Sequence, residues 1–350
     1  MRSFMLFFMT AALSAGLAQS LNNPADSVLL QLFPAASSSQ KEKVHGVSYA
    51  ASCDEYHSLA FAGLDNRVVI YDISRPGKPR QLSESIVASG LIHDLDCSSY
   101  ILCVACGAGG FEIWDVKDPA IPRKLSSLAI PGYAYAVDMA NIHAYVAAGD
   151  SGLMIIDISD PAVPVMTGRH RTPGPALSVR VKGYQAYIAD HDAGLRIVNV
   201  ADPGSPCEVG FCDTPGYALD IDVAGYYAYV ADYKGLCIVD VRDIFKPVMT
   251  GYYKTIGIAR GVCVRVPYAY IADHAAGLRI ININRPANLE EAGFHYTPGR
   301  ACAVSLVDVY AYIAGDSGLF VQNISRSSNQ KLLLLLPVIL FLFWIPVLLH

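Results

Sequence analysis

Two histidines beside aspartates are the residues in this sequence best suited to chemistry. They occur in the triplet Asp190-His191-Asp192 and in the pair Asp273-His274. A histidine close to carboxylates can hold a divalent cation, or can act with them as an acid and base pair. His191, Asp192 and His274 are therefore candidate ligands for a divalent cation such as Ca²⁺. A plainer explanation is that each aspartate accepts a hydrogen bond from the backbone of its own turn and leaves the histidine exposed.

Both motifs occupy the same position of a repeat that runs through most of the chain. An Asp or Asn ends a strand-like segment seven times, at Asp72, Asp115, Asp157, Asn199, Asp240, Asn282 and Asn323. Each unit contains four short apolar or alternating segments bounded by turn residues, as in LSVRV, AYIAD, GLRIVNV and PCEVGFC. Four strands in about 42 residues, without helical periodicity, predict an all-β fold, a seven-bladed β-propeller of four-stranded blades.

The turns have a specific chemistry. We expect the glycines that open the third segment of a unit to take positive φ and reverse the chain; they are Gly152, Gly194, Gly235, Gly277 and Gly318.

The seventh unit, from Ala301 onward, has only three of the four segments. A strand-like segment, SVLLQLF at residues 27–33, precedes the first unit. We expect this segment to close the ring as the outer strand of the last blade, because a closed ring has no exposed edge there. The propeller would then span residues 27–326.

Both ends of the chain are apolar and stand apart from the propeller. Residues 1–18 combine Arg2, an apolar run and the small residues Gly16 and Ala18, which predicts a secretory signal peptide. An uncleaved anchor is the alternative. Residues 332–349 carry no charge and as a helix would cross a thin membrane, which predicts a C-terminal membrane anchor. A cleaved sorting tail or a shifted reading frame are the alternatives.

In a propeller, the turns between second and third strands and the crossings between blades lie on one face, which we call the loop face. Its polar and aromatic residues vary more than a blade requires. The candidate binding residues are Asp190, His191, Asp192, Tyr217, Asp232, Tyr233, Arg260, Asp273, His274 and Arg300. They predict a surface that binds a protein or a glycan.

Charged residues also recur on the innermost segments, which face the channel. They are Asp94, Asp96, Asp138, Asp220 and Asp222, together with Arg180 and Arg265. Carboxylates near one axis raise one another's pKa, and a bound cation would relieve this. Ion pairs with the two arginines inside a solvated channel are the alternative explanation.

Other chemistries find little support. The net charge is −5 and the basic residues are scattered, so nucleic acid is not an expected partner. The sequence has no serine nucleophile elbow, phosphate-binding glycine loop or metalloprotease helix. Nine cysteines are an odd number, so at least one thiol is free or intermolecular. Cys103 and Cys106 are expected to pack in the core, whereas Cys207 and Cys212 have no pairing that the sequence reveals.

The segments AYVAAGDSGLMIIDISDPAVP and AYIADHDAGLRIVNVADPGSP resemble the LVIVD repeat family, and the resemblance spans about residues 45–324. Members of that family are propellers found mostly in exported or surface proteins of bacteria and archaea. The resemblance implies the fold and an exported location, but it carries no shared catalytic motif.

We therefore expect an exported, membrane-tethered β-propeller at the cell surface or the outer face of the membrane. It would act as a binding, adhesion or interaction scaffold for a protein or a glycan, and would meet the membrane through its tail. The alternative is a metal-assisted hydrolase, lyase or lactonase, with its site at the channel mouth around His191 and His274. A structural component of a surface layer is a third possibility.

Overall fold

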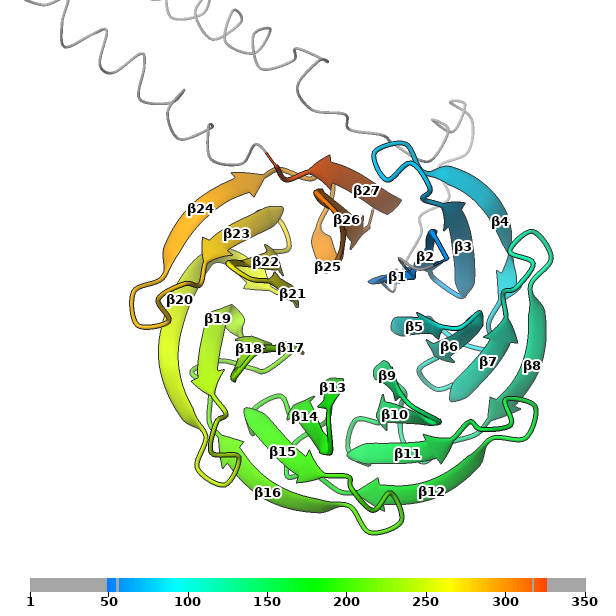
Figure 1. The fold of residues 1–350 in the computed structure, drawn as a ribbon, viewed down its shortest axis with the longest axis horizontal. Coiled ribbons are helices and arrows are strands. Elements are labelled where there is room, and N and C mark those ends of the chain that lie inside the picture. Colours follow the sequence, from blue (N-terminus) through cyan, green and yellow to red (C-terminus); the bar gives the residue numbers. More distant parts are fainter. Residues whose placement is uncertain (1–48, 55–56, 317, 326–350) are drawn as a thin grey trace, which may run out of the picture.

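The computed structural model describes residues 49–54, 57–316 and 318–325. Within these ranges every regular element is a strand, and the strands form six antiparallel sheets of four and one of three, in chain order. The seven sheets stand as blades around a central channel (Figure 1). The predicted all-β, seven-bladed propeller is therefore confirmed.

The two inner strands of each blade are short and of similar length. The innermost strands are β1 (Tyr49–Asp54), β5 (Asp94–Ser98), β9 (Ala136–Ala140), β13 (Ser178–Lys182), β17 (Asp220–Ala224), β21 (Gly261–Arg265) and β25 (Ala301–Val307). The second strands are β2 (Leu59–Leu64), β6 (Ile101–Ala105), β10 (His143–Ala147), β14 (Gln185–Ala189), β18 (Tyr227–Ala231), β22 (Tyr268–Ala272) and β26 (Tyr310–Gly315).

A third strand follows in all seven blades, and an outer strand in the first six. The third strands are β3 (Arg67–Asp72), β7 (Phe111–Asp115), β11 (Leu153–Asp157), β15 (Leu195–Asn199), β19 (Tyr233–Asp240), β23 (Leu278–Asn282) and β27 (Gly318–Asn323). The outer strands are β4 (Arg80–Val87), β8 (Arg123–Leu128), β12 (Val165–His170), β16 (Cys207–Cys212), β20 (Val248–Ala259) and β24 (Glu290–His295). We number the blades 1 to 7 in this order.

The second and third strands are apolar on both faces because each blade packs between two neighbours. A separate cluster of buried side chains fills each of the seven spaces between blades. A strand buried on both faces shows a continuous apolar run instead of alternation.

The last blade also packs on the first. Tyr71 of blade 1 and Leu319 of blade 7 belong to one cluster. The Tyr312 hydroxyl donates to the Pro76 carbonyl over 2.7 Å, and β25 contacts β1, so the ring is closed by direct packing.

The predicted three-stranded seventh unit is confirmed by the sheet β25-β26-β27. The segment 27–33 that we expect to complete it lies outside the described residues. The predicted signal peptide at 1–18 and anchor at 332–349 also lie outside them. In the part of the chain that the structure describes, no helix has the length and apolar character needed to span a membrane.

Blade 5 departs from the expected turn. Gly152, Gly194, Gly277 and Gly318 have positive φ as predicted, but Gly235 does not. The turn of blade 5 is one residue shorter, and Tyr233 takes the left-handed conformation with a φ of 66°. As a result β19 starts at Tyr233, which pairs with Ala259 at the end of the extended strand β20.

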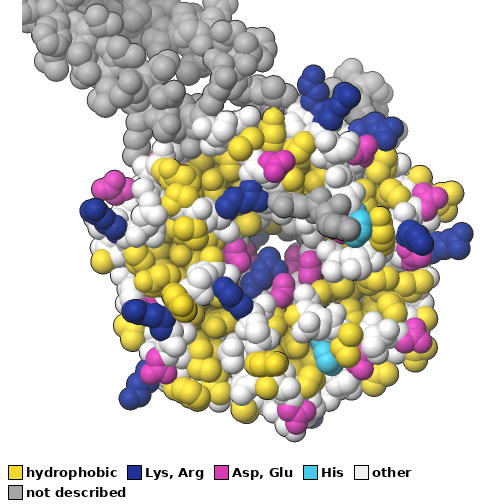
Figure 2. All heavy atoms as spheres, viewed as in Figure 1, with side chains coloured by type: hydrophobic (Ala, Val, Ile, Leu, Met, Phe, Trp, Pro, Cys, Tyr) yellow, Lys and Arg dark blue, Asp and Glu magenta, His cyan; other side chains and the backbone are white. Residues whose placement is uncertain are grey.

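The face opposite the loop face carries two sets of turns. One joins innermost to second strands and the other joins third to outer strands. We call it the hairpin-tip face. Figure 2 views this face and shows hydrophobic side chains spread over the blades, with charged groups both around the central opening and along the outer rim.

Candidate functional site

Three of the predicted loop-face residues are buried. Asp190, Asp232 and Asp273 are each 0% exposed. The Oδ2 atom of each accepts a hydrogen bond from the N–H of a glycine 16 residues earlier, in the preceding blade crossing, over 2.9–3.0 Å. We expected each aspartate to accept a hydrogen bond from its own turn. The bond that all three have in common comes instead from the preceding crossing. They tie the crossings to the turns and hold the loop face in shape.

Burial is the main cause that raises the pKa of each of these three carboxyls. The Arg196 guanidinium lies 3.7 Å from Asp190, and that of Arg279 lies 3.6 Å from Asp273. Both arginines also approach a glutamate of the outer strand, at 3.5 Å. These contacts are salt bridges between adjacent strands of one blade.

Beside the buried aspartates, the structure places His191, Tyr217 and Tyr233 together at the surface. The His191 ring stacks on the Tyr217 ring with centroids 4.3 Å apart and an angle of 4°. Tyr233 meets Tyr217 edge to face at 5.9 Å. Tyr217 and Tyr233 remain 47% and 42% exposed, so this stack joins blades 4 and 5 and still offers ring surface to a ligand. Asp192 is exposed next to it, 3.6 Å from His191 Nδ1.

A second aromatic cluster lies where blade 2 meets blade 3. His93 Nε2 lies 2.9 Å from the Tyr133 hydroxyl, and the Tyr133 and Tyr135 rings are 4.7 Å apart. Burial lowers the pKa of His93, which favours the neutral ring. His93 and Tyr135 were not among the predicted binding residues. Each crossing between blades contains a glycine, and His93, Tyr135 and Arg260 lie three residues after Gly90, Gly132 and Gly257. A comparison of this position between repeats would have identified both residues.

His274, Arg260 and Arg300 form a third group, between blades 6 and 7. The Arg300 N–H donates to Asp316 Oδ1 over 2.7 Å. Burial first, and then the charges of Arg260 and Arg300, hold the pKa of His274 below its ordinary value. The Arg300 guanidinium also lies 3.7 Å from the Asp316 carboxylate, and the histidine of this group favours the neutral form.

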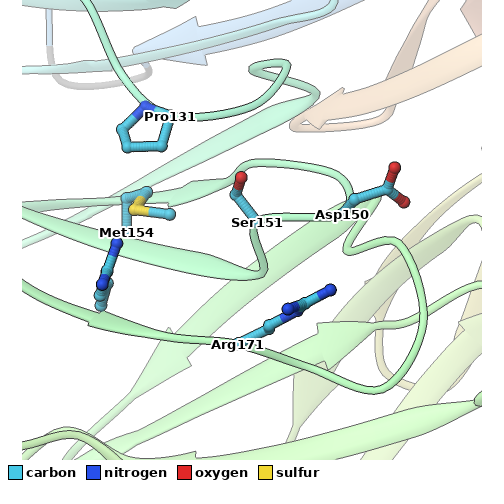
Figure 3. A pocket seen from close by; sticks show the side chains of 6 residues that line it. Pro131, Asp150, Ser151, Met154 and Arg171 are labelled. Atoms are coloured by element: carbon cyan, nitrogen blue, oxygen red, sulfur yellow. The ribbon is translucent and has the colours of Figure 1, made fainter.

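A pocket opens on the loop face at blade 3 (Figure 3). It has a volume of about 450 Å³ and is lined by Pro131, Asp150, Ser151, Met154, Arg169 and Arg171. Asp150 and Ser151 lie on the turn between β10 and β11, and Arg171 follows β12 (Figure 3). Both arginines are exposed, and no ion pair or hydrogen bond of their side chains forms within the described residues. Such a pair can bind a carboxylate, sulfate or phosphate group of a ligand.

The two histidine motifs do not converge. His191 belongs to blade 4 and His274 to blade 6, with blade 5 between them. Across residues 49–54, 57–316 and 318–325, no three His, Cys, Asp or Glu side chains are grouped so that they could hold a metal ion.

The channel contains a network of charges that links successive blades. Arg180 Nη1 lies 3.1 Å from Asp138 Oδ1, and Asp138 Oδ2 accepts the Val181 N–H over 2.7 Å. Asp94 and Asp96 accept N–H bonds from the innermost strand of blade 3 in the same way. Asp220 and Asp222 accept N–H bonds from that of blade 6. The ion-pair explanation of the channel is therefore confirmed for Arg180, while Arg265 donates to backbone carbonyls of blade 7.

Burial raises the pKa of Asp94 to about 7. It also raises the pKa of Asp96, where the charge of Asp138 adds to it, to about 6. In the unfolded chain both carboxyls return to their ordinary pKa near 3.8. The folded state therefore binds protons more tightly, and the stability that they contribute is complete below about pH 4 and is lost as the pH rises through 6 to 7.

Replacing Asp94 with asparagine tests this linkage. Asn keeps an oxygen for the Val137 N–H but does not titrate. The stability of the wild type relative to Asp94→Asn should fall by roughly 2 kcal/mol between pH 4 and pH 8, a value reduced from the full shift because water enters the channel. Comparing the two proteins cancels the opposing effect of His93, His274 and His295, whose pKa values are lowered. Urea unfolding at several pH values provides the measurement.

The control is Asp157→Asn, in a turn where the side chain accepts the Ser159 N–H over 2.8 Å and asparagine can do the same. Its stability should differ from that of the wild type by the same amount at pH 5.5 and at pH 8. An Asp94→Asn difference that does not change with pH would contradict the linkage.

The cysteines lie mostly inside the blades. Cys103 and Cys106 are 0% exposed, which confirms that they are core residues. Cys207 is exposed and Cys212 half-buried at the two ends of β16, and both are free thiols.

The fold and the loop face together define a seven-bladed β-propeller scaffold. The chain belongs to the LVIVD repeat family. The sequence profile of the LVIVD repeat matches residues 131–172, 173–214, 215–255, 256–297 and 298–334, which is more than half of the chain. Blades 1 and 2 fall outside these matches.

Solved structures share the ring at low sequence identity. The β-propeller domain of Cps50 (Swd1) from Myceliophteria thermophila is 12% identical, with a TM-score of 0.64 over 80% of this chain and 97% of that one. A chain of a Mitotic Checkpoint Complex is 12% identical, with a TM-score of 0.67 over 80% and 91%. The computationally designed protein Ika8 is 10% identical, with a TM-score of 0.58 over 80% and 97%. These similarities concern the fold. A comparison with curated proteins finds no match.

Proposed function

We propose that this protein is an exported, membrane-tethered interaction scaffold whose loop face binds a protein or a glycan at the cell surface. The observation that carries the proposal is the group of exposed aromatic rings held in place by buried hydrogen bonds. Gly216, which precedes Tyr217, is fixed by the buried Asp232 carboxylate, and Tyr217 stacks on His191. A ring positioned before binding loses little freedom when a ligand docks on it.

The chemistry of the loop face also suits such a partner. Aromatic rings offer flat surfaces for apolar faces of sugars or for side chains, and tyrosine and arginine dominate binding energy in many interfaces. The pocket of Arg169 and Arg171 would add recognition of an anionic group beside them. The family resemblance and the apolar segments at 1–18 and 332–349 support export and tethering.

The test is a comparison of binding by the full chain and its variants, in a nonionic detergent, to a glycan array and to immobilised envelope proteins. Tyr217→Ala and His191→Ala each remove half of the stack and should weaken binding at least about ten-fold. Tyr226→Ala is the matched control, because Tyr226 is at least as accessible as Tyr217, at 68% against 47% exposed, but lies on the hairpin-tip face. Binding that is absent in the wild type, or is weakened equally by all three variants, would overturn the proposal.

A further inference from the structure

The hairpin-tip face carries an unusual set of exposed apolar side chains. Five lie on the turns between innermost and second strands of consecutive blades and are 44–68% exposed; they are Ile142, Tyr184, Tyr226, Val266 and Val309. Three more lie farther out, on turns between third and outer strands, and are 64–68% exposed; they are Ile121, Val163 and Phe245. Together they extend over blades 2 to 7 of a single face, and Figure 2 shows how widely hydrophobic side chains cover it. Large apolar side chains repeated on the tips of six successive blades of one face are more than scattered single residues, and they point to contact with an apolar partner.

These tips are held rigidly. The residue that follows each third strand donates its N–H to a carbonyl of the turn between the two inner strands, as Val200 does to Tyr184 over 2.8 Å and Val241 to Tyr226 over 3.0 Å. The backbone of the inner turns is therefore already ordered before any partner contacts their side chains.

The end of the propeller lies on the same face. β27 runs from the loop face to the hairpin-tip face, and the N–H of Ile324, one residue beyond it, donates to the carbonyl of the tip residue Val309 over 2.8 Å. Only six residues, 326–331, separate Ser325 from the apolar segment that starts at Leu332. Six residues span at most about 20 Å, so a membrane that holds 332–349 lies close to this face.

We propose that the hairpin-tip face rests on the lipid surface, with the tip side chains in the interfacial layer and the loop face directed away from the membrane. Tyr184 and Tyr226 suit the headgroup level, where aromatic rings with a polar end are enriched, and Ile142, Val163 and Phe245 suit the layer below. The inference rests on the proposed tether and adds the orientation of the ring to it.

The charges of the face indicate the kind of lipid. Aspartates stand beside the outer tips, where Asp118, Asp160 and Asp243 each accept an N–H bond from their own turn. Lys117 and Lys246 lie on two of the same turns and offset part of this charge, and Arg242 forms an ion pair with Asp240. A mixed face of this kind has no strong attraction to anionic lipid, so apolar burial should drive contact with zwitterionic headgroups and added salt should change it little.

The experiment reports which face meets the lipid. The full chain with Cys207→Ser, which removes an exposed native thiol, is reconstituted in phosphatidylcholine vesicles with an environment-sensitive label at Tyr226→Cys or at Tyr217→Cys. We expect the fluorescence emission of the label at position 226 to shift to shorter wavelength and to be quenched by nitroxide lipids. Both effects should appear at low and at high salt. The loop-face label at position 217 should show neither effect. A second variant, Tyr184→Asp with Val266→Asp, should abolish the quenching at position 226 while the circular dichroism spectrum is unchanged.

Two other outcomes would overturn the inference. A chain that floats with the vesicles while neither label is quenched, or while both are quenched equally, would have its tether but no preferred face. A chain that does not float with the vesicles would lack the tether itself. Neither outcome concerns ligand binding at the loop face, which the detergent assay measures separately.

Discussion

Arg180→Ala is expected to destabilise the propeller by about 2–3 kcal/mol near pH 8, and by clearly less near pH 5. Arg180 lies against Asp138 at 3.1 Å, and the charges of Asp138, Asp222, Asp94 and Asp220 all raise its pKa. Without the guanidinium these carboxylates repel one another in a confined channel. The estimate is at the low end for a buried charge because 38% of the Arg180 side chain remains open to channel water, which screens part of the interaction.

The pH dependence distinguishes this electrostatic role from simple loss of packing. Protonation near pH 5 removes charge from carboxyls whose pKa is raised, so less repulsion remains for Arg180 to offset. Urea unfolding of the full chain in nonionic detergent at pH 5 and pH 8 gives both values. Arg169→Ala is the control, because that arginine is exposed and makes no side-chain bond within the described residues; it should change stability by less than about 0.5 kcal/mol. An equal loss for Arg180→Ala at both pH values would show that charge is not the cause.

Gly216→Ala is expected to cost about 3 kcal/mol or more and to abolish ligand binding at the loop face. A Cβ at this position would stand 1.8 Å from the backbone oxygen of Asp232 and 3.0 Å from its carbonyl carbon. Neither atom can move without shifting the turn. The crossing would have to retreat and break the 3.0 Å bond from the Gly216 N–H to Asp232, and this would displace Tyr217 from His191.

Gly204→Ala provides the matched control for this substitution. It adds the same methyl group in an exposed turn where the nearest atom, Asp202 Oδ1, is 3.4 Å away. Its stability and binding should equal those of the wild type within about 0.5 kcal/mol. Thermal unfolding and the glycan and envelope-protein assay measure the two effects. If Gly216→Ala were as stable as Gly204→Ala, the close approach of crossing and turn would not be required by the fold.

The buried aspartates of the loop face and the aspartates of the channel both hold neighbouring parts of the ring together, through different hydrogen bonds. On the loop face, three aspartates each accept an N–H bond from the crossing that precedes their turn; they are Asp190, Asp232 and Asp273. In the channel, three others each accept an N–H bond from the innermost strand of the next blade; they are Asp94, Asp96 and Asp138. Acidic residues that invite a catalytic interpretation therefore act largely as hydrogen-bond acceptors for backbone. The aromatic rings, the exposed arginines of the blade 3 pocket and the exposed Asp192 remain available to a ligand.

The sequence by itself determined the number of blades, the four-strand unit and the three strands of the seventh repeat. These follow from local physics: buried strands need apolar runs, and glycine and proline end or reverse them at fixed places. The burial of Cys103 and Cys106 followed from the same repeat.

Only the tertiary structure decided which polar residues face a ligand. An aspartate such as Asp190 looks the same in sequence whether it bonds its own turn or a glycine 16 residues earlier, and the choice depends on how closely the crossing approaches. The stack of His191 with Tyr217, the cluster of His93 with Tyr133 and the alignment of apolar tips on one face join residues from different blades. No local pattern specifies such contacts, because they arise when separate repeats, about 42 residues apart, pack into one ring.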